Sequence, residues 1–231
     1  MAFSHGTPNS IVTDGLVFCV DPANVLSWSG PDSSNVNDLI NTNNGTIYND
    51  TSGSYGDNNS FAFDGTDDYI EIPNNSSLQI TSNLTLSCWV KAGNVSGTNS
   101  IIDKFYDGTD RSYMLRITST TIRLSLGNTD GSSSIEYRST AVLSNNIWYY
   151  ITTTFSSTDN EVKIYINDSL DSTHSKTNLI SSNTQPLRIG SGYNLLNDFN
   201  GNISQVQIYN RALSAQEVLQ NYNALKNRFR T

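Results

Sequence analysis

Residues 61–73 (FAFDGTDDYIEIP) carry apolar side chains at every second position on both sides of a central turn. Such alternation is typical of strands with one buried face. Asp64 and Gly65 begin the turn with residue types that tolerate bend geometry, and Asp67 and Asp68 add two further carboxylates. The stretch therefore predicts a β-hairpin with an acidic turn, which is either a metal site or only a bend.

The same alternation recurs along the chain in short runs that are divided by polar turn residues. Charged residues make up only 15%, and the abundant Asn, Ser, Thr and Gly suit turns and exposed strand faces better than long helices. A pattern of this kind in 231 residues predicts one all-β domain of two antiparallel sheets packed face to face. The expected strands are 16–20, 60–63, 69–72, 84–91, 100–104, 113–118, 121–126, 134–139, 148–155, 161–166, 187–189 and 201–209, with a brief strand at 46–48.

One helix is predicted, at the end of the sequence. Ser214 and Glu217 have the spacing of a capping box, in which each side chain bonds the other residue's backbone amide. The apolar residues that follow share one helical face: Val218, Leu219, Tyr222 and Leu225. We expect an N-terminal arm at 1–10, a sandwich at 11–213, and a helix with its tail packed on the sandwich at 214–231.

The charge and hydropathy of the chain exclude several classes of partner. With a formal net charge of −8 and a pI near 4.5, the protein would repel a phosphate backbone. No run of 18 apolar residues occurs, and residues 1–10 lack the features of a secretory signal. We therefore expect neither nucleic acid nor a membrane as a partner. If the protein works outside a cell, we expect it to arrive by another route or to be released by lysis.

The two cysteines, Cys19 and Cys88, lie in strand-like runs. Buried free cysteine is common, so we interpret both as core residues, with a disulfide as the alternative. The few Cys and His residues show none of the spacings typical of zinc sites.

Four segments in this order resemble the laminin G-like jelly rolls of the concanavalin A-like lectin/glucanase superfamily. They are GLVFCVD at 15–21, FAFDGTDDYIEIP with LTLSCWVK at 61–91, residues 147–168, and residues 186–218. The sequence is most similar to the variety found in phage tail, fibre and head proteins, because an NNGT loop follows the first segment. This resemblance implies a concanavalin A-like jelly roll and implies a function only loosely.

The resemblance also implies a structural calcium ion. Asp21 and the carbonyl of Gly65 match two of the ligand positions of relatives, while Ser204 and Gln205 stand where relatives have carboxylates. A site with fewer carboxylates binds calcium more weakly. Further oxygen ligands in the acidic turn would be Asp64 and Asp67. In the alternative interpretation, these aspartates only accept hydrogen bonds within the turn.

Glycosidases of this superfamily resemble one another in carboxylates spaced two apart on one strand, which this sequence lacks. Its single pair at that spacing, Asp159 and Glu161, falls at a predicted hairpin tip. A second acidic stretch at 103–110 is interpreted as a solvated turn, since its spacing does not match a calcium loop. We expect no enzymatic activity.

Several aromatic residues fall in predicted loops and are candidates to stack on a sugar: Trp28, Tyr48, Tyr55, Tyr106 and Tyr193. The alternative is that they fasten these loops to the sandwich. Trp89 and Trp148 lie within strands, so we assign both to packing.

Two functions compete at this point. In the first, the protein is a structural component of a phage virion surface, in the head or tail, with capsid or tail proteins, glycans and further copies of itself as partners. The resemblance of the sequence to phage proteins and its expected polar surface favour this hypothesis. In the second, it is a free, extracellular carbohydrate-binding module or lectin.

Overall fold

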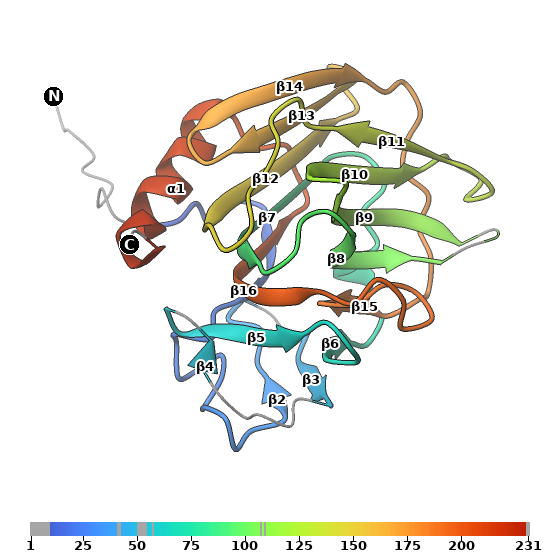
Figure 1. Ribbon diagram of the computed structural model, residues 1–231. Coiled ribbons are helices and arrows are strands. Elements are labelled where there is room, and N and C mark those ends of the chain that lie inside the picture. Colours follow the sequence, from blue (N-terminus) through green and yellow to red (C-terminus); the bar gives the residue numbers. More distant parts are fainter. Residues whose placement is uncertain are drawn as a thin grey trace, which may run out of the picture.

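The structure, a computed structural model, describes residues 10–40, 43–49, 55–56, 58–106, 108 and 110–229. Two antiparallel β-sheets pack face to face, and one helix lies beside them at the end of the described chain (Figure 1). This arrangement confirms the predicted two-sheet jelly roll with a C-terminal helix. The division of the chain at 10 and 213 stays a prediction, and residues 1–9 of the expected arm lie outside the described part.

Sheet A contains eight strands, with β1 pairing only with β16. In spatial order they are β14 (Ser169–Ser175), β13 (Glu161–Ile166), β12 (Tyr149–Ser156), β7 (Leu84–Ala92), β16 (Asn200–Tyr209), β5 (Ser60–Asp64) and β4 (Tyr55–Gly56), with β1 (Leu16–Val20) on β16. Strand β14 was not expected, because its sequence SLDSTHS has no apolar alternation.

Sheet B also contains eight strands. In order they are β11 (Ser134–Arg138), β10 (Thr121–Gly127), β9 (Arg111–Thr118), β8 (Thr98–Phe105), β15 (Leu187–Ile189), β6 (Tyr69–Ile72), β3 (Gly45–Tyr48) and β2 (Asn35–Val36). A short 3-10 helix, η1 (Ser76–Leu78), follows β6.

The predicted hairpin at 61–73 is wrong in its pairing, although both of its strands exist. β5 pairs with β16 and β4 in sheet A, whereas β6 pairs with β15 and β3 in sheet B. The acidic turn therefore crosses from one sheet to the other. Gly65 has a φ of 80°, a left-handed conformation that glycine adopts without steric cost. The predicted alternation of apolar and polar side chains is confirmed, because each strand turns one face to the core.

The main core lies between the inner faces of the two sheets. Phe61 and Phe63 reach it from sheet A, and Ile70 and Ile72 reach it from sheet B. Cys88 is buried in this layer, while Cys19 is buried beneath the helix, and both are free thiols. This confirms that the cysteines are core residues.

Helix α1 (Ala215–Phe229) covers the outer face of sheet A. Its Phe229 ring stacks on Trp89, with ring centroids 4.4 Å apart, and lies 4.7 Å from the ring of Trp148. Both tryptophans therefore pack, as predicted. Leu219 does not belong to the buried face, because it is 41% exposed, and the amide side chain of Asn221 is buried there instead.

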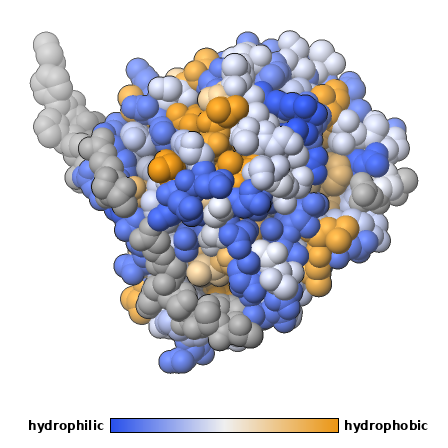
Figure 2. Space-filling model, in the orientation of Figure 1, coloured by the Kyte–Doolittle hydropathy of each residue, from blue (hydrophilic) through white to orange (hydrophobic). Residues whose placement is uncertain are grey.

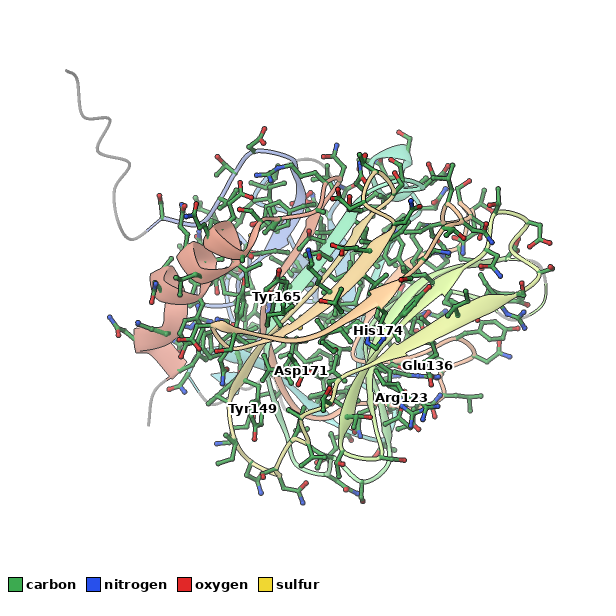
Figure 3. The ribbon with its side chains drawn as sticks, turned by 90° about the horizontal axis from the view of Figure 1, so that it is seen from above. Arg123, Glu136, Tyr149, Tyr165, Asp171 and His174 are labelled. Carbon is green, nitrogen blue, oxygen red and sulfur yellow. The ribbon has the colours of Figure 1, made fainter. Side chains whose placement is uncertain are left out.

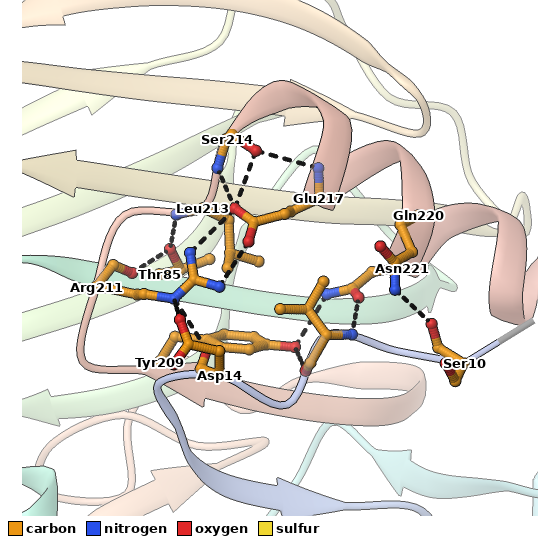
Figure 4. Close-up of polar contacts among 11 residues, drawn as sticks. Ser10, Asp14, Thr85, Tyr209, Arg211, Leu213, Ser214, Glu217, Gln220 and Asn221 are labelled. Carbon is orange, nitrogen blue, oxygen red and sulfur yellow. Dashed lines mark hydrogen bonds and ion pairs between the residues drawn. The ribbon is translucent and has the colours of Figure 1, made fainter. Parts of the chain in front are cut away.

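The predicted capping box begins this helix (Figure 4). The Ser214 amide donates to the Glu217 carboxylate over 2.8 Å, and the Glu217 amide donates to the Ser214 hydroxyl over 3.3 Å. Arg211 binds both oxygens of Glu217, and these bonds lower the pKa of that carboxyl to about 2. The carboxylate therefore stays ionised and keeps the first helical turn in place.

Polar contacts join the open edges of the two sheets, from β14 to the chain around β11 (Figure 3). The Asp171 carboxylate accepts the backbone amides of Thr140 and Ala141 at 2.7 and 2.8 Å. A ring nitrogen of His174 lies 2.9 Å from the Arg138 carbonyl. These contacts fix the edge of sheet B that carries part of the candidate site.

The face seen in Figure 2 is largely hydrophilic, with apolar side chains in separate small areas. Among the residues that the structure describes, no helix has the length and apolarity to cross a membrane.

Candidate functional site

A polar hollow lies on the outer face of sheet B, around strand β9. We call it the β9 cleft. It has a volume of about 430 Å³, within the range of small-ligand sites. It is lined by Asp103, Phe105, Arg111, Met114, Arg116, Ser125, Ser133, Ser134, Glu136, Tyr193, Leu196 and Asn197.

Strand register explains why these side chains meet. Asp103 on β8 lies opposite Met114 on β9, Met114 lies opposite Ser125 on β10, and Ser125 lies opposite Glu136 on β11. The four residues form one row on the same face, because directly paired residues point to the same side of a sheet. Arg188 on β15 lies opposite Asp103 on β8, and this extends the row to β15.

A parallel row of three arginines runs beside the first. Arg123 lies opposite both Arg116 and Arg138 on its two neighbouring strands. All three guanidinium groups contact Glu136, with N–O distances of 2.6 Å from Arg116 and 2.8 Å from both Arg123 and Arg138. Figure 3 shows the side chains of Arg123 and Glu136 next to one another. These contacts lower the pKa of Glu136, although burial acts in the opposite direction.

Asp103 is the buried carboxyl of the cleft, with 4% of its surface exposed. Burial raises its pKa to about 7, and the nearby charges of Arg188 and Arg116 reduce this shift only in part. Its carboxylate accepts the Phe105 amide over 2.8 Å and the amide of Tyr193. The sequence-based interpretation of Asp103 as part of a solvated turn is therefore wrong. The predicted strand at 100–104 already contained Asp103, and β8 confirms that placement.

Two of the predicted aromatic residues meet at the rim of this cleft. The rings of Tyr106 and Tyr193 have centroids 3.7 Å apart at an angle of 58°, and their hydroxyl groups are hydrogen-bonded. Tyr193 also lines an adjoining pocket of about 150 Å³. Asp103, Phe105 and Tyr193 line both hollows. The structure thus combines a half-buried aromatic pair with a row of charged and hydroxyl-bearing groups.

The other predicted aromatic residues are elsewhere. Trp28 is 1% exposed and packs on Phe61 in the core, with its indole N–H donating to the Ser33 carbonyl. Its assignment as a sugar-stacking residue is wrong, because the surrounding loop folds over it. Tyr48 is 39% exposed and stacks on Tyr69, far along sheet B from β9. The side chain of Tyr55 lies outside the described part of the structure.

The predicted calcium ligands are not brought together. Asp64, next to Gly65, pairs with Asn200 at one end of β16, whereas Asp21 contacts Gln205, five residues along the same strand. At about 3.3 Å per residue this separation is roughly 15 Å. Asp21 and Gly65 therefore cannot share one ion. Calcium binding by other groups stays a prediction.

A guanidinium group occupies the place next to Asp21. Arg228 on α1 contacts the Asp21 carboxylate at 2.7 Å, the carbonyls of Asn58 and Asn59 at 2.9 and 2.8 Å, and the Ser204 hydroxyl. These carboxylate, carbonyl and hydroxyl oxygens are the ligand types that a hard cation uses. The protein supplies the positive charge from its own helix.

The acidic turn forms its own small cluster. Carboxylate oxygens of Asp64, Asp67 and Asp68 lie within 4.8 Å of one another. Asp68 accepts the Asp64 amide over 2.9 Å, and Asp64 accepts the Thr66 amide over 2.7 Å. These hydrogen bonds stabilise the turn without a metal ion. Metal binding by this cluster stays a prediction.

The geometry of the cleft does not match that of a glycosidase. Asp103 and Glu136 are separated by three strand spacings, which is about 14 Å between their Cα atoms. A glycosidase needs two carboxyl groups that are free to act as acid and as base or nucleophile. Both oxygens of Glu136 are also bound by guanidinium groups. Glu161 pairs instead with Lys163 at 2.7 Å, on the other sheet.

The fold is similar to the folds of solved binding domains of protein toxins. One is the binding domain of Paraclostridial Mosquitocidal Protein 1, with 19% identity and a TM-score of 0.64 over 93% of this chain and 53% of that one. Another is botulinum neurotoxin type C, whose cell entry is described as dependent on two ganglioside molecules. It has 16% identity and a TM-score of 0.65 over 92% of this chain and 51% of its own.

A third is the binding domain of botulinum neurotoxin DC in complex with SialylT, with 14% identity and a TM-score of 0.62 over 92% of this chain and 52% of that one. The chain thus spans about half the length of these solved chains. A comparison with curated proteins gave no match. A family model described as the concanavalin A-like lectin/glucanases superfamily matches residues 64–219. Because this match covers most of the sequence and agrees with the two-sheet fold, the chain belongs to the laminin G-like family of the concanavalin A-like lectin/glucanase superfamily.

Proposed function

We propose that the protein binds carbohydrate without hydrolysing it, and that the β9 cleft is the binding site. The observation that carries this proposal is the Tyr106–Tyr193 pair at the rim of a polar cleft. Aromatic rings stack on the apolar faces of sugars, and charged or amide groups next to them bond the hydroxyls. Two of the similar toxin structures are described with a ganglioside or SialylT, which supports this class of ligand.

The absence of catalysis is part of the proposal. Asp103 and Glu136 lie on strands three spacings apart, about 14 Å between their Cα atoms. The absence of catalysis is supported by the guanidinium groups on Glu136, which occupy the oxygens that a nucleophile or base would use.

The test is binding of a broad oligosaccharide panel, measured by ligand-observed NMR and then titrated by calorimetry. Changing Tyr193→Ala should weaken binding about five- to thirtyfold, since loss of an aromatic contact in a site costs roughly 1 to 2 kcal/mol. Tyr48→Ala is the matched control, because Tyr48 is an exposed tyrosine on the same sheet but far from β9. Equal affinities in both variants would place the site elsewhere, and a panel without any binder would refute the function.

A structural role on a phage virion is the second candidate, and the observation that favours it is the similarity of the four sequence segments to phage head and tail proteins. In that setting the sandwich would attach to capsid or tail proteins, and the β9 cleft would face outward. Mass spectrometry of purified particles should then find the chain at a fixed copy number. Its presence only as a free protein would contradict this assignment.

A further inference from the structure

The charges of the β9 cleft are opposite to those of the whole protein. The formal net charge is −8, yet five of the eight arginines lie on this face of sheet B. They are Arg111, Arg116, Arg123, Arg138 and Arg188. In the described part of the chain the carboxylates among them are Asp103, Asp110, Glu71 and Glu136. Two of these are already ion-paired: Glu71 with Arg188, and Glu136 with three arginines. The face therefore carries an excess of positive charge.

The arrangement of Arg116, Arg123 and Arg138 is unfavourable for folding alone. They lie directly opposite one another on three adjacent strands, where like charges destabilise a sheet. One carboxylate, that of Glu136, compensates for three positive charges. Proteins tend to break such local rules where a site requires it. The row is better explained by a negative ligand than by stability.

Arg116 and Arg123 also hold donors that the described part of the protein does not use. Each guanidinium has five N–H donors, and each makes one hydrogen bond to Glu136. The Nε atoms of both residues are buried without a partner among the described residues. These Nε atoms are closed to solvent, so a ligand would meet the outer N–H groups of the two side chains, which are 23% and 13% exposed. The planar guanidinium suits a carboxylate that binds through two oxygens.

The remaining groups limit what kind of anion fits. Asp103 and Glu136 line the same cleft and offset part of the charge of its arginines, so the remaining positive charge matches one carboxylate better than a doubly charged phosphate or sulfate. The Asp103 carboxyl can bond a sugar hydroxyl, and the Tyr106–Tyr193 pair can contact the sugar ring. The cleft thus combines features for a sugar with features for one negative charge.

We propose that the β9 cleft binds a sugar that carries a carboxylate, and that Arg116 and Arg123 hold this carboxylate. The inference rests on the proposed carbohydrate binding and specifies its ligand class. Sialic and uronic acids are members of this class. Neutral sugars would lack the group that the arginine row recognises.

The experiment compares matched pairs of probes by calorimetry with the full chain. Sialyllactose is compared with lactose, and trigalacturonate with its fully methyl-esterified form. We expect the acidic member to bind at least tenfold more tightly, since hydrogen bonds to charged groups contribute about 1.5 to 3 kcal/mol. Raising the salt from 50 to 500 mM should weaken acidic binding and leave neutral binding unchanged.

Two variants test the arginines. Arg123→Gln should lower acidic affinity at least tenfold, and Arg123→Lys, which keeps the charge but loses the planar fork, should lower it less. Lys163→Gln is the control, because this cation lies on sheet A. Thermal melting shows whether each variant is folded. If Arg123→Gln does not fold, Arg123→Lys still tests the role of the guanidinium group.

The outcomes separate the two proposals. Equal binding of acidic and neutral sugars, lost in Tyr193→Ala, would overturn the acidic-sugar inference and leave carbohydrate binding intact. Preference for a sulfated or phosphorylated sugar over the carboxylated one would also overturn it. Absence of binding to every sugar would refute the proposed function itself.

Discussion

The buried carboxyl of Asp103 should make the stability of this protein depend on pH in a direction unusual for aspartate. Its pKa is about 7 in the folded chain, against 3.8 as the ordinary value. Between these values the folded state holds a proton that the unfolded state has lost. The free energy of unfolding should therefore fall as pH rises through this window and level off above the folded pKa.

The expected magnitude follows from linkage. Each pH unit inside the window changes the free energy of unfolding by about 1.4 kcal/mol. From pH 5 to pH 8 the change attributable to Asp103 is thus roughly 3 kcal/mol. Asp103→Asn removes this titration. The free energy of unfolding of the variant minus that of the parent protein should therefore rise by roughly 3 kcal/mol from pH 5 to pH 8. Other groups titrate equally in both proteins and cancel in the difference.

Urea unfolding followed by tryptophan fluorescence at pH 5, 6, 7 and 8 measures this difference. Asp159→Asn serves as the control, because that carboxyl belongs to an exposed hairpin turn on sheet A. Its difference from the parent should remain small and constant. If the difference between Asp103→Asn and the parent were the same at pH 5 and pH 8, the raised pKa of Asp103 would be refuted.

Three further outcomes are expected. Arg228→Gln should lower the free energy of unfolding by about 3 kcal/mol, since it leaves the largely buried Asp21 without its ion pair, and urea unfolding measures this. Calcium should not raise the melting temperature through Asp21; a rise that disappears in Asp21→Asn would contradict the role given to Arg228. Cys19 and Cys88 should react with a thiol reagent at pH 8 only after unfolding, because burial raises both pKa values, that of Cys19 to about 12.

The fold was predictable because its signals are local. Alternation at residues 61–73 reports which side chains face a core, and this holds whichever strands become neighbours. The capping box of Ser214 and Glu217 needs only residues three apart, so the start of the helix could be placed from sequence. Strand β14 was missed for the same reason, since its exposed residues carry no periodic signal.

The candidate site depends on contacts that sequence order does not contain. Tyr106 and Tyr193 were singled out, but their meeting beside Asp103 depends on the placement of β15 next to β8. The arginine row arises only when β9, β10 and β11 pair in one register, because a slip of one residue would turn the side chains to the other face.

The sequence by itself determined where most of the strands lie, which face of each of these strands is apolar, and where the helix begins. Tertiary structure alone decided that the two strands around the acidic turn belong to different sheets, and that Asp21 pairs with Arg228, 207 positions away. Local patterns follow from the period of the backbone, which every segment carries within itself. Pairing partners follow from competition among many similar strands for one core, and this competition is settled only when the whole chain has folded.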